Sequence, residues 1–268
     1  MTTIDLIADV GESFGSHRMG DDERLLEALS SANIACGFHS GDPMTMERTV
    51  RLCLDRGVTI GAHPGFPDLV GFGRRTIEMS RAEVRADVVY QLGALHAFVV
   101  AAGGRMAHVS PHGRLGNLTV TDATYAEGVL DAVEAFDPSL VVVGQQGLIH
   151  DLAAGRGLAT GRMGFPDRAY HHDGALVSRR EPGAVLHDVD LITERALTMA
   201  LHGFVTSTDG AKVRVDCDSI LLHGDNAASV DAAHRVRRSL EDAGVTIAAR
   251  PRPPVPATEP VRGAALSG

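Results

Sequence analysis

The sequence predicts an α/β fold, an irregular (β/α) barrel built from mostly parallel strands. Short apolar runs alternate with longer segments of helical periodicity, which favours a parallel sheet with helical crossovers. The chain has 268 residues, close to the usual length of one closed barrel, about 250 residues. Polar residues follow the strand candidates, as they do at the active face of such barrels. A doubly wound open sheet is the alternative.

Apolar runs and capping patterns define the expected elements. We expect strands at residues 4–8, 33–36, 58–61, 106–109, 140–143 and 220–222, and helices at 21–31, 43–56, 81–102, 121–136, 188–202 and 228–243. Asp42 is a suitable N-cap for the second helix, with Pro43 at its first position and Gly57 after its end. Ser80 and Glu83 form a capping-box pattern before the third helix.

The composition describes one globular domain. Hydrophobic residues make up 44% and charged residues 22% of the chain, which is typical of globular proteins. We expect a single domain over residues 1–249 and a disordered Pro- and Arg-rich tail over 250–268. The formal net charge of −9 disfavours nucleic acid and an anionic membrane as partners. The first twenty residues contain no long apolar stretch, so we expect no signal peptide, no membrane span and a cytoplasmic location.

Cysteine and lysine usage narrows the possible chemistry. The three cysteines form no CxxC pair, so we expect neither a disulfide framework nor a structural zinc site. Cys36 lies in an apolar run and is interpreted as a buried residue. Lys212 is the only lysine, so the chain has no GxxxxGK[ST] phosphate-binding loop. If the reaction uses ATP, we expect the nucleotide to be bound mainly by another chain.

Titratable residues recur just past the expected strand ends. In a parallel barrel these ends meet on one face, so we expect the residues to share one site. The predicted catalytic residues are Asp9, Glu12, His63 and His112. The predicted substrate-binding residues are His39, Asp42, Arg74, Asp167, Arg168 and His223.

Two chemistries suit such a site. Asp9, His39 and His63 are the expected divalent-metal set, although their spacing matches no self-sufficient metal motif. Alternatively, carboxylates and histidines act as general base and acid in attack on an amide. Arg74 suits a substrate carboxylate, which a guanidinium binds through two parallel hydrogen bonds. The Arg179–Arg180 pair is interpreted as solvated.

Several blocks of the sequence resemble the LamB/YcsF family. They are DLIADVGE at residues 5–12, SANIACGFHSGD at 31–42 and GAHPGFPD at 61–68, followed by GFGR at 71–74, PHG at 111–113, LVSR at 176–179 and LHGD at 222–225. Together the blocks span roughly residues 4–249, and the second and third are long and specific.

The resemblance implies a fold similar to the polysaccharide-deacetylase and glycosidase type of barrel. It also implies the activity of the A-type component of 5-oxoprolinase, which opens 5-oxoproline to glutamate, coupled to ATP hydrolysis, together with B- and C-type components. By position, the family site maps onto Asp9, Glu12, His39, Asp42, His63, Arg74, His112 and His223. We assign water activation to Asp9 or a histidine, protonation of the leaving nitrogen to His112, and the substrate carboxylate to Arg74.

Three positions depart from the family pattern. Ile7 stands where the family usually has Asn, Ser110 where it usually has Lys, and Ala169 where it tends to have Gly. Two alternatives stay open, the first from the Asp9, His39 and His63 set and the second from the departures at Ile7 and Ser110. One is a divalent-metal-dependent amidase or deacetylase that acts alone, and the other is a catalytically degenerate paralogue that binds a ligand or partner. The sequence also leaves a homo-oligomer open.

Overall fold

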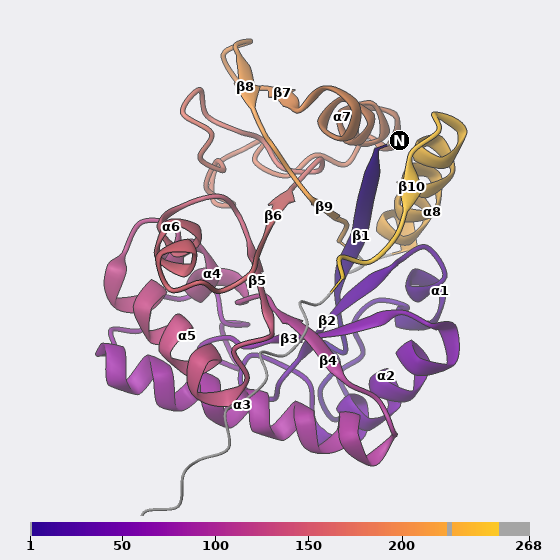
Figure 1. Cartoon of the computed structure of the whole chain (residues 1–268). Helices are drawn as coiled ribbons and strands as arrows, with labels where there is room; N and C mark the ends of the chain where they lie inside the picture. The colour runs from indigo at the N-terminus through magenta and orange to yellow at the C-terminus, as the bar shows by residue number, and fades with distance from the viewer. Residues whose placement is uncertain (1, 224–226, 252–268) are drawn as a thin grey trace, which may run out of the picture.

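Seven parallel strands close into a barrel in the computed structural model, which describes residues 2–223 and 227–251 (Figure 1). The strand order is β1-β2-β3-β4-β5-β6-β9, and β9 pairs with β1 to complete the ring. These strands are β1 (Thr3–Val10), β2 (Ser31–Ala35), β3 (Thr59–His63), β4 (Met106–Val109), β5 (Val141–Gly144), β6 (Thr160–Gly164) and β9 (Ser219–Leu221). The predicted α/β barrel is therefore confirmed, and the open-sheet alternative is wrong.

Three short strands lie outside the ring. β10 (Thr246–Ile247) pairs in parallel with the start of β1, while β7 (Phe204–Thr206) and β8 (Lys212–Arg214) form a separate antiparallel hairpin. The expected tail falls almost wholly on residues 252–268, which lie outside the described residues.

The helices surround the barrel (Figure 1). They are α1 (Asp22–Leu26), α2 (Pro43–Arg56), α3 (Arg81–Ala101), α4 (Gly113–Thr119), α5 (Ala123–Phe136), α6 (Leu148–Gly155), α7 (Val189–His202) and α8 (Ala227–Asp242). Ser80 and Glu83 form the expected capping box at the start of α3. The sequence did not predict α4, α6 or β6, because these segments are short and β6 contains two glycines. α1 is shorter than expected.

One helix, α3, is long and apolar enough to meet a membrane-span criterion by length and composition. Core packing explains the same composition, since Val84, Val88 and Leu92 are buried and α3 lies along α5 (Figure 1).

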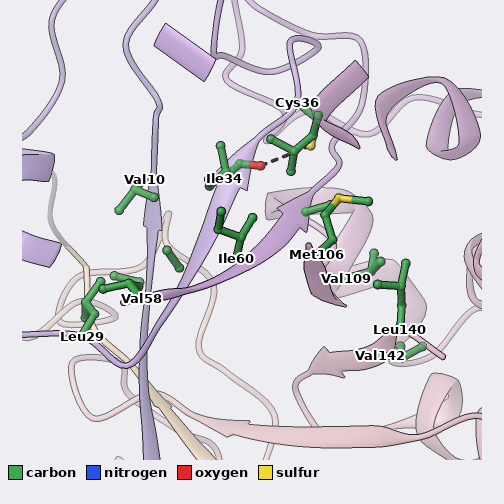
Figure 2. Close-up of a cluster of buried hydrophobic side chains, with 14 of the residues drawn as sticks. Val10, Leu29, Ile34, Cys36, Val58, Ile60, Met106, Val109, Leu140 and Val142 are labelled. Carbon is green, nitrogen blue, oxygen red and sulfur yellow. Dashed lines mark hydrogen bonds between the residues drawn. The ribbon is translucent and has the colours of Figure 1, made fainter. Parts of the chain in front are cut away.

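The main core lies between the barrel wall and the helices. Alternate residues of β1, including Leu6 and Val10, face this core, as the two-residue period of a strand requires. Figure 2 shows part of it, where Ile34 packs near Cys36 and the Cys36 thiol lies 3.2 Å from the Ile34 carbonyl oxygen. Burial raises the pKa of Cys36 to about 12, so this thiol is a buried, unreactive group, as expected.

The opposite face of β1 points into the barrel. Ile7 packs there with Val141, Val143, Met163 and Leu221 in a small apolar cluster. The residue two positions further along, Asp9, instead accepts a hydrogen bond from the Asn33 amide. The barrel interior is thus apolar towards β5, β6 and β9 and polar towards β2. The apolar partners of Ile7 explain why an aliphatic side chain is accommodated at this position.

Candidate functional site

A cavity of about 1340 Å³ opens where the carboxyl ends of the barrel strands meet. Most of the predicted residues come from the ends of β1 to β4 and the loops after them, whereas His223 follows β9 and two arginines, Arg168 and Arg179, lie in the segment after β6. Of the predicted site residues, the cavity is lined by Asp9, Glu12, His39, His63, Arg74, His112, Arg168 and His223. The structure thus brings together side chains that are far apart in the sequence.

His63 and His112 form a directly bonded pair. His63 Nδ1–H donates to the Ser110 carbonyl oxygen at 2.6 Å, and His112 Nε2–H donates to the Phe72 carbonyl oxygen at 2.9 Å. Because both outer nitrogens donate to carbonyl groups, only the inner nitrogens, His63 Nε2 and His112 Nδ1, face each other, at 2.9 Å. Two lone pairs at this distance repel, so a proton or another cation must lie between them.

Asp9 supplies a negative charge to this pair. Its Oδ1 accepts the Asn33 amide at 2.9 Å and lies 3.3 Å from His63 Nε2. Burial alone would raise the pKa of Asp9, but the charge of His63 and its hydrogen bond outweigh burial and hold that pKa well below its usual range. Conversely, burial opposes a charge on His63, but Asp9 and Glu12 together raise the pKa of His63. Asp9 and Glu12 therefore favour the positive charge on the His63 ring, while burial and then the charge of His39 lower the pKa of His112.

A second row of polar groups orients Asp9. His108 Nε2–H donates to Asn33 Oδ1 at 2.8 Å, so the amide group of Asn33 is fixed and its nitrogen points at Asp9. Burial, followed by the charge of His63, lowers the pKa of His108 to about 4. His108 is therefore neutral and acts as a fixed donor.

Glu12 and His39 complete the cluster. His39 stacks on His112 with ring centroids 3.7 Å apart and planes within 3°. Glu12 Oε1 lies 3.2 Å from His39 Nε2 and 3.5 Å from His112 Nδ1. Burial raises the pKa of Glu12, while burial and then His63 lower the pKa of His39.

The group able to hold a metal differs from the expected one. Glu12, His39, His63 and His112 place one ligand atom each within 4.8 Å of the others. His39 and His63 belong to the predicted metal set, but Glu12 and His112 stand in the place given to Asp9. Asp9 lies beside the group, with its oxygen directed to Asn33 and His63.

A strained turn positions His112. Phe72 has φ 53°, unusual for a residue with a side chain. The Gly71 amide donates to Asp68 Oδ1, and the Gly73 amide donates to the Asp68 carbonyl oxygen, each at 2.9 Å. This conformation turns the Phe72 carbonyl oxygen onto the His112 ring. Arg75 is held by Asp68, whereas Arg74 lies 4.9 Å over the Phe72 ring and lines the cavity.

Two predicted site residues do not line the cavity. Asp42 caps α2 by accepting the Met44 and Thr45 amides and also binds the Gly15 amide, so its oxygens are committed to the backbone. Asp167 is buried beneath His223 and accepts a hydrogen bond from its Nδ1. Asp42 therefore fixes the backbone at the start of α2, and Asp167 orients the His223 ring, while neither residue lines the cavity.

The segment after β6, which lines one side of the cavity, carries cationic side chains. Arg179 donates to His223 Nε2 at 2.6 Å, so both ring nitrogens of His223 are engaged and the ring positions Arg179. Arg179 is exposed, in agreement with its interpretation as solvated, and it also lines the cavity. Arg168 is buried and donates to the carbonyl oxygens of Val177 and Ala184. Burial, followed by the charge of Arg179, lowers the pKa of Arg168 to about 10, so it remains cationic.

Sequence reasoning missed Asn33, His108, Arg179 and the carbonyl group of Phe72. Asn33 and Arg179 lie inside blocks that resemble the family, which was the available indication. His108 lies within a strand, and an isolated histidine in an apolar strand gives no sign of its partner.

A carboxyl group beside the cluster makes stability depend on pH. Asp22 accepts the Gly11 amide at 2.9 Å, and burial raises the pKa of Asp22 to about 6. As pH rises from about 4 to 6, the unfolded chain ionises first, so this group lowers the free energy of unfolding over that window and the cost persists above it. Asp22→Asn is therefore expected to stabilise the protein by roughly 1–2 kcal/mol at pH 7.5.

Chemical denaturation at pH 4 and pH 7.5 measures this effect as a difference between variant and wild type. The stabilisation should be present at pH 7.5 and vanish near pH 4. An equal effect at both pH values would contradict the assignment.

Comparison with known proteins places the chain in a family. The LamB/YcsF family pattern matches residues 4–254. An A-type 5-oxoprolinase subunit of Mycobacterium avium is 49% identical over 250 residues, which cover 93% of this chain and 99% of the relative. An A-type 5-oxoprolinase subunit of Agrobacterium fabrum is 48% identical over 248 residues, or 92% and 97% of the two chains.

A solved structure agrees with these relatives. The crystal structure of a lactam utilization protein from Thermus thermophilus superposes with a TM-score of 0.88 at 44% identity, over 92% of this chain and all of that one. The match in sequence and in fold extends over the barrel and every block that forms the cavity, and the chain belongs to the LamB/YcsF family.

Proposed function

We propose that this chain is a hydrolase component of a 5-oxoprolinase, which opens 5-oxo-L-proline or a related small lactam to the amino acid. The proposal includes coupling to ATP hydrolysis and partner subunits of the B and C type. Relatives with 48% and 49% identity are named as A-type subunits of 5-oxoprolinase. The observation that carries the proposal is a cavity that combines a charged histidine pair and two carboxylates with arginine side chains.

Lactam opening needs a base, an electrophile and a proton for the leaving nitrogen. The raised pKa of Glu12 suits a base that accepts a proton from water. The lowered pKa of Asp9 makes it a poor base and a permanent counter-charge for His63. The proton shared by His63 and His112 then passes to the ring nitrogen when the carbon–nitrogen bond breaks.

A substrate carboxylate requires a cation near this group. Arg74 lines the same cavity on the loop that also positions His112, and Arg168 and Arg179 line it from the segment after β6. A guanidinium binds a carboxylate with two parallel hydrogen bonds, so it would set the orientation of the lactam ring as well as bind it.

The cavity also exceeds what a small lactam requires, since drug-sized ligands occupy pockets of about 300–1000 Å³. Opening an amide ring without strain needs activation, and this chain carries no phosphate-binding loop of the GxxxxGK[ST] type. We therefore assign the binding of ATP mainly to partner subunits. The part of the cavity that a small lactam does not fill would hold the group with which those subunits activate the lactam.

The test measures glutamate release from 5-oxoproline with the purified chain, B- and C-type subunits and ATP. We expect product only in the complete mixture, and at least about 100-fold less with His112→Ala, as for loss of a general acid. Equal product from the variant, or none from the complete mixture with wild type, would contradict the proposal.

Two alternatives have their own discriminating outcomes. The histidine–glutamate group favours a stand-alone metal amidase or deacetylase, which would turn over its substrate without ATP or partners. Ser110 lines the cavity with a short, uncharged side chain where the family usually has Lys, and this favours a catalytically degenerate paralogue. Activity that appears only in the Ile7→Asn, Ser110→Lys double variant would support the latter.

A further inference from the structure

Four ligand atoms of the cluster, one each from Glu12, His39, His63 and His112, lie within 4.8 Å of one another. Neighbouring atoms are separated by 3.2 Å (Glu12 Oε1 to His39 Nε2), 3.5 Å (Glu12 Oε1 to His112 Nδ1) and 2.9 Å (His112 Nδ1 to His63 Nε2). Around a tetrahedral ion with bonds of about 2.0–2.1 Å, ligand atoms lie about 3.3 Å apart. The cluster therefore has nearly the dimensions of a first-row metal site, and the His39 ring, which is stacked on His112, would tilt to direct its lone pair at the ion.

The histidine rings are also oriented for a metal. Histidines that bind metals donate their other ring N–H to a carbonyl or carboxylate group, which fixes the tautomer and aims the lone pair. His63 and His112 each donate to a backbone carbonyl oxygen, Ser110 and Phe72 respectively. Their remaining lone pairs converge, and the position between them requires a cation.

The charge of the surroundings matches a dication. The three histidines are neutral when they act as ligands, and Glu12 and Asp9 supply two negative charges beside them. Arg74, on the loop after β3, also acts on Glu12 through its charge. A divalent ion would make the group neutral, which a buried site favours.

We propose that Glu12, His39, His63 and His112 bind one divalent transition-metal ion, with zinc as the first choice and cobalt as its substitute. Three imidazoles and one carboxylate suit such ions better than Mg²⁺ or Ca²⁺, which prefer oxygen ligands. When bound, the ion would take the position of the shared proton and supply a Lewis acid for an amide carbonyl oxygen, in place of the base and acid roles given above to Glu12 and the His63–His112 pair. Asp9 would remain as the free carboxylate. The site is independent of which amide is the substrate.

The full chain is purified, treated with a chelator, dialysed and loaded with Zn²⁺ or Co²⁺. Elemental analysis gives the stoichiometry, and the visible spectrum of Co²⁺ reports nitrogen and oxygen ligation. We expect one ion per chain in wild type. Glu12→Gln and His112→Asn should each bind more than about 100-fold more weakly, because each removes a direct ligand, a larger loss than that of an outer partner.

His17→Asn is the matched control, since His17 is exposed and lines the same cavity but lies outside the cluster. It should keep one ion. Zinc should also raise the melting temperature of wild type and His17→Asn, but not that of Glu12→Gln, whose folding is checked by circular dichroism. Wild type with less than about a tenth of an equivalent after loading, or Glu12→Gln with full occupancy and shift, would overturn the site.

Glutamate release is measured on the same samples, so the two proposals can fail separately. A bound ion without turnover in the complete mixture supports the metal site and contradicts the 5-oxoprolinase function. Full turnover by wild type that binds no ion overturns the metal site and leaves the proposed function standing.

Discussion

Asp9→Asn is expected to reduce lactam opening by about 10²- to 10⁴-fold, the range typical of a lost acid–base group. The amide has the size of the carboxylate but no charge. Asp9 is the charge that holds a proton on His63 against the cost of burial. Without it the His63–His112 pair loses its positive charge, and the leaving nitrogen loses its proton donor. The measurement is kcat for glutamate release in the complete mixture.

Asp5→Asn is the matched control for this variant. Asp5 lies on the same strand and also points into the barrel, where it accepts hydrogen bonds from Ser30 and Ser31, but it does not line the cavity. We expect its kcat to be within about twofold of wild type. A similar loss in both variants would mean that the effect comes from damage to the barrel and not from the site.

Gly61→Ala is expected to have the largest effect on stability, a loss of roughly 3 kcal/mol, the upper part of the usual range for overpacking. Gly61 lies between Asn33 and His108 in the strand register. The His108 ring passes over Gly61 to reach the Asn33 amide, and a methyl group at Gly61 would overlap that ring. The variant should therefore also lose the orientation of Asn33 towards Asp9, and activity should fall with stability.

The same substitution at another position, Gly93→Ala, is expected to change stability in the opposite direction. Gly93 is exposed on α3, and a methyl group there meets nothing within 4 Å. Alanine is favoured over glycine in a helix by roughly 0.5–1 kcal/mol, so this variant should be slightly more stable than wild type. Urea denaturation of both variants measures the difference. A Gly61→Ala protein as stable as wild type would contradict the described packing of His108.

The sequence by itself determined the fold class and most of its elements. The strands at residues 4–8 and 106–109 and the helices after Asp42 and Ser80 were predictable, because apolar periodicity and capping act over a few residues. The family was also predictable, since its blocks are long. It was predictable that strand ends would carry the polar side chains, because parallel strands of a barrel end on one face.

Only the tertiary structure decided what each of these side chains does. Asp42 and Asp9 look alike in the sequence, yet Asp42 is bound to backbone amides and Asp9 to Asn33 and His63. Likewise, His112 belongs to the metal-sized group because the Phe72 carbonyl oxygen orients its ring, and Glu12 belongs to it because its carboxylate lies against His39 and His112. The physical reason is the distance along the chain over which each kind of interaction acts. Helix and strand formation depends on near neighbours, whereas hydrogen-bond partners and pKa values depend on groups that only closure of the barrel brings together.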